Sequence, residues 1–305
     1  MSLNDPRTNF LFWNLQGKPL TQNIVRIAES HDIHVLLFAE TAFQDNASTL
    51  EDALNAGPRP PDTQTFSSVP GSSASRVQMF SRLKHPQWVR KITHKYYEVW
   101  SLTTDAEYAL SLAAVHFPSI QVDQGDGQRR TAMELRTDIE DLNLENDSGE
   151  APVIICGDFN ASPYDPGLVG IYGLNASPSR EIVQRSGGRR TLHERSYPYL
   201  YNPMWRLLGG SEGRPTAPSA RDQPPRIYGT YYNSNLRKSV DPFWYTLDQV
   251  LVSPSLLPFF HDEELRVLTR DADAERSGVS LVSPAGIPKA ETYSDHLPLV
   301  FSVHL

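Results

Sequence analysis

The sequence predicts a mixed α/β fold, because short apolar stretches of strand length recur along its 305 residues and amphipathic helical patterns lie between some of them. With 39 % hydrophobic residues, the chain can bury one large core or two smaller ones. The apolar stretches are rich in β-branched or aromatic residues and are bounded by Pro, Gly, Ser or Asp. The predicted strands are Asn9–Leu15, His34–Phe38, Val77–Ser81, Ala109–His116, Val153–Asp158, Thr246–Val252 and Leu297–Val303.

Two segments between these stretches have the periodicity of amphipathic helices. We expect a first helix over Thr21–Ser30, with Thr21 as its N-cap residue, and a second over Arg129–Leu144. Other segments lack such a pattern and are expected to be long loops, which in a compact domain are often functional. These expected loops are Gly57–Ser75, Ala176–Arg226 and Asp271–Glu291.

Composition excludes several classes of protein. Acidic residues outnumber basic ones, 36 to 28, which argues against a protein that coats nucleic acid through a strongly basic surface. No segment resembles a signal peptide or a membrane span, so we expect a soluble, cytoplasmic protein without a membrane partner. The single cysteine, Cys156, lies in an apolar run and is expected to be a small buried hydrophobe, which excludes disulfides and zinc fingers.

The strongest local signal is Val153–Asn160, an apolar strand followed by an acid and an amide. Residues i and i+2 of a strand face the same side, so Asp158 and Asn160 can point at one reacting group if the chain stays extended. The carboxylate can then take a proton from water, while the amide donates to a phosphate oxygen. The alternative is a turn in which Asp158 accepts hydrogen bonds from the backbone.

A second polar cluster, within Tyr293–Val300, precedes the last predicted strand. Asp295 can serve a hard cation, and His296 can bind phosphate or exchange a proton near neutral pH; a turn with an incidental histidine is the alternative. Asp248 opens another apolar strand, where a buried carboxylate is costly unless it is paired. We expect His296 to be its partner, because a carboxylate beside an imidazole favours the imidazolium.

Two more strands end in a single polar side chain. The segment Val35–Glu40 ends in a carboxylate, and Phe10–Asn14 ends in an amide. A magnesium ion takes oxygen ligands and keeps several waters, so one or two protein carboxylates are sufficient. Taken alone, Glu40 is as consistent with a surface or cap residue and Asn14 with a turn residue.

In this order along the chain, the motifs resemble the endonuclease/exonuclease/phosphatase superfamily over essentially all of residues 8–305. The resemblance implies a four-layer α/β/β/α sandwich of two mixed sheets with helices outside and a site at one end of the sheets. The candidate residues reach from Asn14 to His296, so a single domain over residues 1–305 is expected. The matching motifs are Trp13-Asn14, Glu40, His116, Gly157–Asn160, Leu247–Val250 and Ser294–His296.

The resemblance also assigns roles by position. It implies that Glu40 is the principal ligand of a Mg²⁺ or Mn²⁺ ion, with Asn14 and Asp295 as direct or water-mediated ligands. His116 falls where the superfamily has a residue that contacts the phosphate or protonates the leaving group. Abasic-site endonucleases usually have tyrosine there, so a role in abasic-site repair is not favoured, and the chain is more similar to the deoxyribonuclease I-like, sphingomyelinase-like and phosphatase branches.

The remaining roles concern the attacking water. The resemblance implies that Asp158 activates or orients this water and that Asn160 holds it or a phosphate oxygen. The Asp248–His296 pair is expected to stabilise the transition state. Which of Asp158 and His296 is the formal base stays open at this point.

We expect a nuclease, with DNA as the favoured substrate and endonucleolytic action. Arginines and lysines accompany aromatic residues in several loops, where they can neutralise phosphates while rings stack on bases. Asn233 and Trp244, in the aromatic segments before Asp248, are the substrate-side candidates. The alternatives are a phosphatase or phosphodiesterase of small phosphoesters, which the acidic net charge favours, and a catalytically silent binding module.

Overall fold

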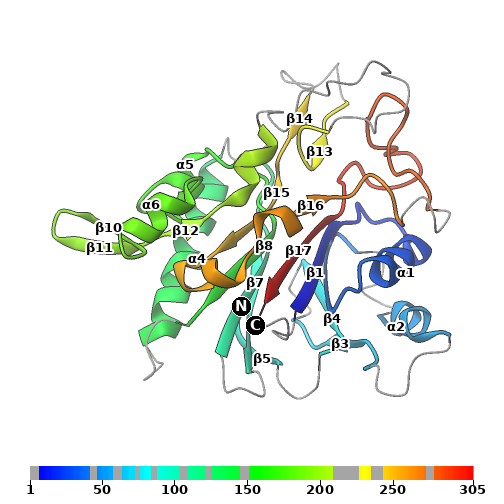
Figure 1. The fold of residues 1–305 in the computed structure, drawn as a ribbon, viewed down its shortest axis with the longest axis horizontal. Helices are drawn as coiled ribbons and strands as arrows, with labels where there is room; N and C mark the ends of the chain where they lie inside the picture. The colour runs from blue at the N-terminus through cyan, green and yellow to red at the C-terminus, as the bar shows by residue number, and fades with distance from the viewer. Residues whose placement is uncertain are drawn as a thin grey trace.

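The computed structural model describes residues 7–41, 47–57, 64–72, 76–83, 88–103, 109–120, 125–144, 151–208, 227–234, 243–272 and 278–304. A six-stranded and a seven-stranded sheet form its centre (Figure 1). In the six-stranded sheet, β1 and β2 are parallel and the other neighbours are antiparallel. Its strands, in spatial order, are β16 (Arg266–Val267), β17 (Leu299–His304), β1 (Arg7–Asn14), β2 (Val35–Ala39), β4 (Val77–Ser81) and β3 (Ser67–Val69).

The seven-stranded sheet is also mixed, with β7 parallel to β8 and β12 parallel to β9. Its strands, in spatial order, are β5 (Trp88–His94), β6 (Tyr97–Thr103), β7 (Ala109–His116), β8 (Val153–Asp158), β15 (Asp248–Val252), β12 (Leu200–Tyr201) and β9 (Ala176–Ser177). Two hairpins lie outside the sheets, one of β10 (Arg189–Leu192) with β11 (Arg195–Pro198) and one of β13 (Tyr231–Tyr232) with β14 (Trp244–Tyr245).

Helices cover the outer faces of both sheets (Figure 1). Helices α1 (Thr21–Ser30) and α2 (Ala47–Asn55) pack on the six-stranded sheet, and α4 (Asp126–Leu144) and α5 (Pro166–Val169) pack on the seven-stranded one. Shorter elements are α6 (Arg180–Arg185) and the 3-10 helices η1 (Pro203–Leu208), η2 (Pro254–Phe259) and η3 (Asp262–Glu264). The predicted α/β sandwich of two mixed sheets with helices is confirmed.

Strand alternation divides the apolar residues among the layers. Phe10 and Phe12 of β1 belong to the core between the sheets, whereas Leu11 and Trp13 belong to the core under α1 and α2. Every one of these side chains is fully buried, and burying a side chain of this size stabilises the fold by roughly 1.5–3 kcal/mol. Cys156 of β8 is likewise buried between the sheets as a free cysteine, as the sequence predicts.

Two sequence predictions about local structure are wrong. Thr21 is the first residue of α1 rather than its N-cap; the N-cap is Leu20, which makes no side-chain cap and is buried in the core beneath the helix. The segment 176–226 is not a long loop over its described part, residues 176–208, which contains β9, α6, β10, β11, β12 and η1. These elements are two to six residues long, too short for hydrophobic periodicity to reveal.

The other two expected loops are irregular to different degrees. The described part of 57–75 contains β3, and the described part of 271–291 forms only isolated bridges, such as Val282 to Pro288. The remainder of these segments, and residues 209–226, lie outside the described residues. None of the described helices has both the length and the apolar character that crossing a membrane requires.

Candidate active site

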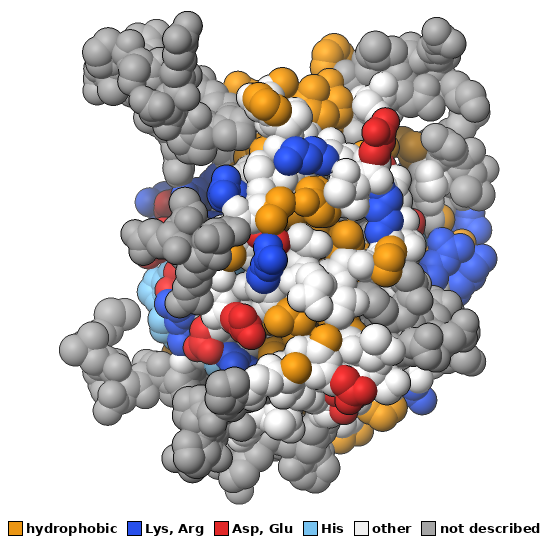
Figure 2. Space-filling view, turned by 90° about the vertical axis from the view of Figure 1, so that its right-hand side faces the viewer, with side chains coloured by type: hydrophobic (Ala, Val, Ile, Leu, Met, Phe, Trp, Pro, Cys, Tyr) orange, Lys and Arg blue, Asp and Glu red, His pale blue; other side chains and the backbone are white. Residues whose placement is uncertain are grey.

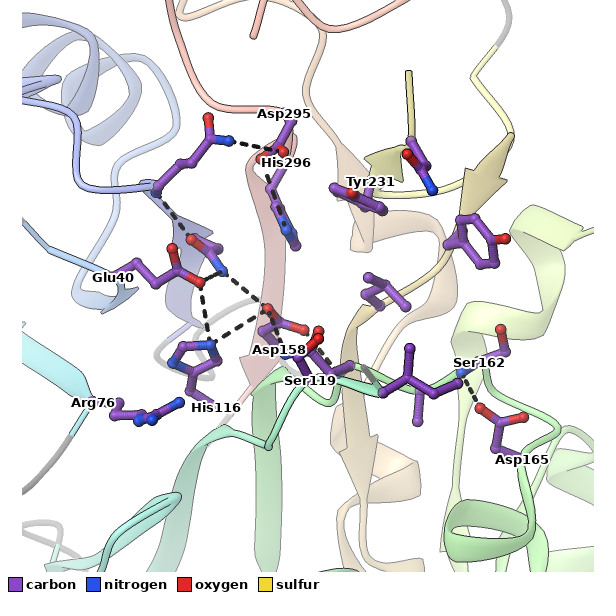
Figure 3. Close-up of a pocket in the computed structure, with 18 residues that line it drawn as sticks. Glu40, Arg76, His116, Ser119, Asp158, Ser162, Asp165, Tyr231, Asp295 and His296 are labelled. Atoms are coloured by element: carbon purple, nitrogen blue, oxygen red, sulfur yellow. Dashed lines mark hydrogen bonds and ion pairs between the residues drawn. The ribbon is translucent and has the colours of Figure 1, made fainter. Parts of the chain in front are cut away.

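Strands of both sheets end at one edge of the sandwich, and their registers bring the candidate residues together. Asp158, the last residue of β8, lies directly between His116 of the parallel strand β7 and Asp248 of the antiparallel strand β15. Asn14 ends β1 in the other sheet, and its Nδ2 donates to Oδ2 of Asp158 across 2.9 Å. This buried hydrogen bond ties the two sheets together at the site (Figure 3).

The backbone here requires particular residues. Gly157 has φ 154°, and a Cβ at this position would lie 2.0 Å from the carbonyl oxygen of Val115, so only glycine allows β7 and β8 to pair this closely. The chain then leaves the extended conformation, because Asn160 has φ 47°. The extended conformation through Asn160, which the sequence left open beside a turn, is therefore not adopted. The turn that was the alternative forms instead, with the Asn160 backbone N–H donating to Oδ1 of Asp158 across 2.8 Å.

This turn still delivers both side chains to one place. Asn160 Nδ2 donates to the Phe117 carbonyl at 3.0 Å and lies 3.3 Å from Oδ2 of Asp158. Together with Asn14, these donors hold the orientation of the Asp158 carboxylate, which is almost fully buried. A carboxylate held in this way can orient a water molecule without a reorganisation cost of its own.

Glu40 and His116 meet beside Asp158. Glu40 follows β2 with φ 49°, and its Oε1 lies 3.3 Å from His116 Nε2. His116 Nε2 is also 3.9 Å from Oδ2 of Asp158. The hydrogen bond from His116 lowers the pKa of Glu40 to about 2, although partial burial opposes the shift. Glu40 is therefore a carboxylate at all physiological pH values.

Asp248 and His296 form the contact that the sequence predicts. His296 Nδ1 lies 2.8 Å and 3.0 Å from the two oxygens of Asp248, and both side chains are buried. Burial alone would lower the pKa of His296, but the negative charge of Asp248, with those of Asp158 and Asp295, raises it to about 10. Burial also raises the pKa of Asp248. The pair thus holds a proton at neutral pH and presents a cation to the cavity.

The structure narrows the roles expected for Asn14 and Asp295. Asn14 turns its amide nitrogen toward both Glu40 and Asp158, while its Oδ1 accepts a hydrogen bond from the Gln16 backbone at 3.0 Å. In this orientation the amide nitrogen of Asn14 faces the two carboxylates, and its role as a metal ligand stays a prediction. Asp295 accepts from Gln16 Nε2 at 2.9 Å, and its Oδ1 lies 4.0 Å from His296 Nε2. Burial raises the pKa of Asp295.

These residues surround one cavity of about 660 Å³, within the usual range for ligand sites. Asp248 lies behind His296 and does not reach the cavity wall. The lining residues are Asn14, Gln16, Glu40, Arg76, His116, Ser119, Ile120, Asp158, Asn160, Ala161, Ser162, Asp165, Tyr231, Asn233, Tyr245, Leu247, Asp295 and His296. All of the predicted site residues except Asp248 and Trp244 therefore contribute to this wall.

Trp244 is not a cavity residue, and the reason is strand alternation in the β13–β14 hairpin. Tyr231 pairs with Tyr245, and both line the cavity. Tyr232 pairs with Trp244 on the opposite face of the hairpin, where their rings pack edge to face with centroids 5.4 Å apart. Trp244 is partly buried against the core under α1 and α2. The aromatic residue that faces the cavity is its neighbour Tyr245.

Some lining residues were not assigned to the site by sequence reasoning. Asp165 and Ser162 belong to the turn before α5, and nothing in the sequence distinguishes this turn from other Asp- and Pro-containing turns. Gln16 sits two residues after Asn14, and this spacing is the only sequence feature that could have indicated it. Arg76 was one of many basic residues in the sequence, and its place in the wall of the cavity that His116 also lines appears only in three dimensions (Figure 3).

The model of the endonuclease/exonuclease/phosphatase family matches residues 11–296, nearly the whole chain. The protein belongs to this family. It is therefore a member of a family of phosphoester hydrolases, which are generally dependent on divalent metal ions. No curated protein sequence matches the chain significantly.

Solved structures with the same fold support the architecture. An endonuclease/exonuclease/phosphatase family protein from Bacteroides thetaiotaomicron is 14 % identical with a TM-score of 0.54, and 98 % of each chain is covered. A mannosyl-6-phosphatase from the same organism is 13 % identical with a TM-score of 0.52, over 96 % of this chain and 98 % of that one. TDP2 from Caenorhabditis elegans is 10 % identical with a TM-score of 0.51, and both chains are covered completely. Identities this low establish the fold alone.

The donor set of this family member fits a divalent cation. Glu40, His116 and Asp158 each offer one ligand atom, and these atoms lie within 4.8 Å of one another. Two carboxylates in this set favour a hard ion over a thiophilic one. Asp158, Asp248 and His296 are equally close, but Asp248 lies behind His296 and does not line the cavity. Glu40 and Asp158, which do line it, are therefore the better candidate metal ligands.

Proposed function

We propose that this protein is a Mg²⁺- or Mn²⁺-dependent phosphodiesterase that hydrolyses nucleic acid, with DNA as the favoured polymer. The observation that supports this most is the convergence of Glu40, His116, Asp158 and His296 from both sheets on one cavity. In-line hydrolysis of a phosphate needs a polarised phosphate, an oriented water and stabilisation of the leaving oxygen. The cavity contains a candidate for each task.

The proposed roles follow from the contacts. Glu40 would hold the metal ion, with Asp295 and Asp158 nearby, and the bound ion would supply charge to polarise the phosphate. Asp158 would orient the attacking water and accept its proton, because Asn14 and Asn160 fix the carboxylate in place.

Cationic and amide groups would complete the site. His296, oriented through Nδ1 by Asp248, would direct its other nitrogen at the phosphate and stabilise the charge that develops there. His116 would contact the phosphate or donate a proton to the leaving oxygen. Asn160 would hold the water or a phosphate oxygen from the rim of the same cavity.

Aromatic and amide side chains favour a nucleic acid substrate. Tyr231, Tyr245 and Asn233 line the cavity with His296, and half-buried rings at a cavity wall can stack on bases. Arg76 adds a cation that can neutralise a backbone phosphate.

A phosphatase of small phosphoesters is the second candidate, because the surface is not that of a polymer-coating protein. The net charge is −8 at pH 7. On the described part of the face shown in Figure 2, basic and acidic side chains are interspersed and form no continuous basic area. A small phosphoester can be bound by the cavity alone, whereas binding of a long duplex also requires contacts with the protein surface outside the cavity.

A turnover assay distinguishes these possibilities. Purified protein would be incubated with supercoiled plasmid, single-stranded DNA, RNA and bis-p-nitrophenyl phosphate, in Mg²⁺, Mn²⁺ or EDTA. Metal-dependent cleavage of DNA is the expected result, and Asp158→Ala should lower the rate by about 10³-fold. Asp52→Ala, which removes an exposed carboxylate on α2, is the matched control.

Other outcomes redirect the proposal. Cleavage of the small diester alone would favour the second candidate. Cleavage of DNA that survives Asp158→Ala would show that the assigned residues do not form the active site. A wild-type protein that binds metal but hydrolyses none of the probes would support a binding module, in which the same residues hold a ligand without turnover.

A further inference from the structure

The charges around the active-site cavity are distributed unevenly. Arg76 lies at one end of the cavity and Asp165 at the other, with Asp158 between them (Figure 3). Arg76 is the only arginine or lysine among the described residues that line the cavity. The two ends therefore offer opposite electrostatic environments to whatever flanks the reacting phosphate.

Arg76 is exposed and available to a ligand. Its guanidinium lies over the ring of Tyr96, 5.2 Å from the centroid, and it makes no ion pair within the described residues. The Tyr96 ring covers only one face of the planar guanidinium, so the N–H groups at the edge of the guanidinium stay accessible to a ligand. A guanidinium in this situation is suited to a phosphate or carboxylate group.

Asp165 has the opposite character. Its Oδ2 accepts a hydrogen bond from the Ser162 backbone at 2.7 Å, and no described residue donates to Oδ1 or brings a cation to the carboxylate. A carboxylate that no cation compensates suits a neutral group that carries hydroxyl or amino donors, such as a sugar or a base.

We infer that the cavity takes its substrate in one direction, with a second anionic group over Arg76 and a neutral, hydroxyl-bearing group against Asp165. This inference rests on the proposed function, because it concerns the groups on either side of the phosphate that is hydrolysed. A second phosphate on the Asp165 side would face an unpaired carboxylate and be repelled.

The inference narrows the substrate class. The interior of a polynucleotide carries phosphates on both sides of any linkage, so one of them would lie near Asp165. The end of a strand, or a small molecule with two phosphates, carries the second anionic group on one side only. The cavity thus favours a strand end or a small bisphosphate over the internal linkages expected of an endonuclease.

Binding measurements test the direction without relying on turnover. Calorimetry in Mg²⁺ would use the Asp158→Asn variant and thymidine dinucleotides with no terminal phosphate, with one at either end, or with one at both ends. The terminal phosphate that lies over Arg76 should tighten binding about tenfold. The terminal phosphate at the other end, which faces Asp165, should weaken binding or have no effect. Fructose 1,6-bisphosphate against fructose 6-phosphate forms the small-molecule arm.

Second-site variants identify the residues responsible. Adding Arg76→Gln should abolish the tenfold gain, and adding Asp165→Asn should remove the penalty at the other end while keeping an acceptor for Ser162. Arg90→Gln, an exposed arginine of β5 outside the cavity wall, is the matched control and should change neither. A gain in the dinucleotide arm indicates a strand end, and a gain in the fructose arm alone indicates a free bisphosphate.

The inference and the proposed function fail in different ways. Equal effects of the two terminal phosphates, a gain that survives Arg76→Gln, or no binding in either arm would overturn the inference. Metal-dependent cleavage of DNA by the wild-type protein in the same preparation would leave the proposed function standing in each case. Directional binding without any turnover would instead support the inference and contradict the proposed function.

Discussion

Nδ1 of His296 lies 2.8 Å from Oδ2 of Asp248 in the interior of the protein, and this contact joins the strand β15 to the segment that precedes β17. The carboxylate is fully buried and has no other cationic neighbour among the groups that shift its pKa. The protonated imidazole compensates the charge of the buried carboxylate. The carboxylate in turn fixes the orientation of the imidazole and favours its positive charge. The first prediction tests this relationship.

Asp248→Asn should lower the pKa of His296 from about 10 to its ordinary range or below. The charge that raises this pKa is removed, whereas burial, which lowers it, remains. NMR titration of the His296 ring checks the shift, and hydrolysis of bis-p-nitrophenyl phosphate should slow about 10- to 100-fold. Glu264→Gln, which removes the partner of His304 at 2.9 Å on the surface, should change neither quantity. An unaltered His296 titration would contradict the assigned electrostatics.

Gly157→Ala should destabilise the fold by about 3 kcal/mol or more. The added Cβ would lie 2.0 Å from the Val115 carbonyl oxygen, and φ 154° is unfavourable for alanine. Thermal or urea unfolding measures the loss. Gly17→Ala is the control, since φ is 67° there but no atom lies within 4 Å of the added Cβ, and it should cost only about 1 kcal/mol. Equal losses in the two variants would mean that β7 and β8 separate easily.

His34 should make the fold less stable in acid. Burial lowers its pKa to about 4, and Nδ1 accepts a hydrogen bond from the Asn9 backbone at 3.0 Å, which requires the neutral ring. In the unfolded chain the pKa is near 6.5, so the unfolded state binds more protons between these values. The contribution of His34 is therefore complete above pH 6.5 and is lost as the pH falls toward 4.

Urea unfolding of wild type and His34→Asn at pH 7.5, 5.5 and 4.5 measures this contribution. The difference in stability between the two proteins should shrink by about 1–2 kcal/mol toward acid, after allowance for the partial exposure of the ring. Subtracting the free energy of unfolding of the variant from that of the wild type removes the contribution of carboxylates that titrate in the same pH range. A difference that stays constant with pH would show that His34 is protonated equally in both states.

Mg²⁺ or Mn²⁺ should stabilise the folded protein through Glu40. A ligand present at about ten times its dissociation constant adds roughly 1.4 kcal/mol to the free energy of unfolding. The melting temperature should rise with metal and fall back with EDTA, and Glu40→Gln should abolish the rise. Glu263→Gln, an exposed carboxylate of η3, should retain it. A rise that persists in Glu40→Gln would place the main metal site elsewhere.

Local sequence patterns were sufficient for the secondary structure that has a strong periodic or apolar signal. The predicted bounds of β7, β8 and α1 are confirmed to the residue, because each is a continuous apolar or amphipathic segment with polar or turn residues at its ends. The short strands and helices of residues 176–208 carried no such signal. Pairing with β15 and packing against η2, rather than local preference, decide that part of the chain.

One tertiary contact could also be predicted from the sequence, because the cost of burying a charged side chain does not depend on the detailed fold. A carboxylate at the start of the apolar strand Asp248–Val252 needed a partner, and His296 is that partner. By contrast, the turn at Asn160 depends on hydrogen bonds to Asp158 and to the distant Phe117 carbonyl. No property of the local sequence distinguishes this turn from a continued strand.

The sequence by itself determined the mixed α/β class and the polar residues at the strand ends, because apolar periodicity and the cost of burying charge are properties of short segments. The order of its motifs indicated the family, and the resemblance to that family implied the layered sandwich. The tertiary structure alone decided that Tyr245 and not Trp244 faces the cavity, that Asn14 turns its amide nitrogen inward, and that Arg76 and Asp165 occupy opposite ends of one cavity. Each of these depends on which face of a strand or turn meets residues far away in the chain, and only the packing of the two sheets sets that choice.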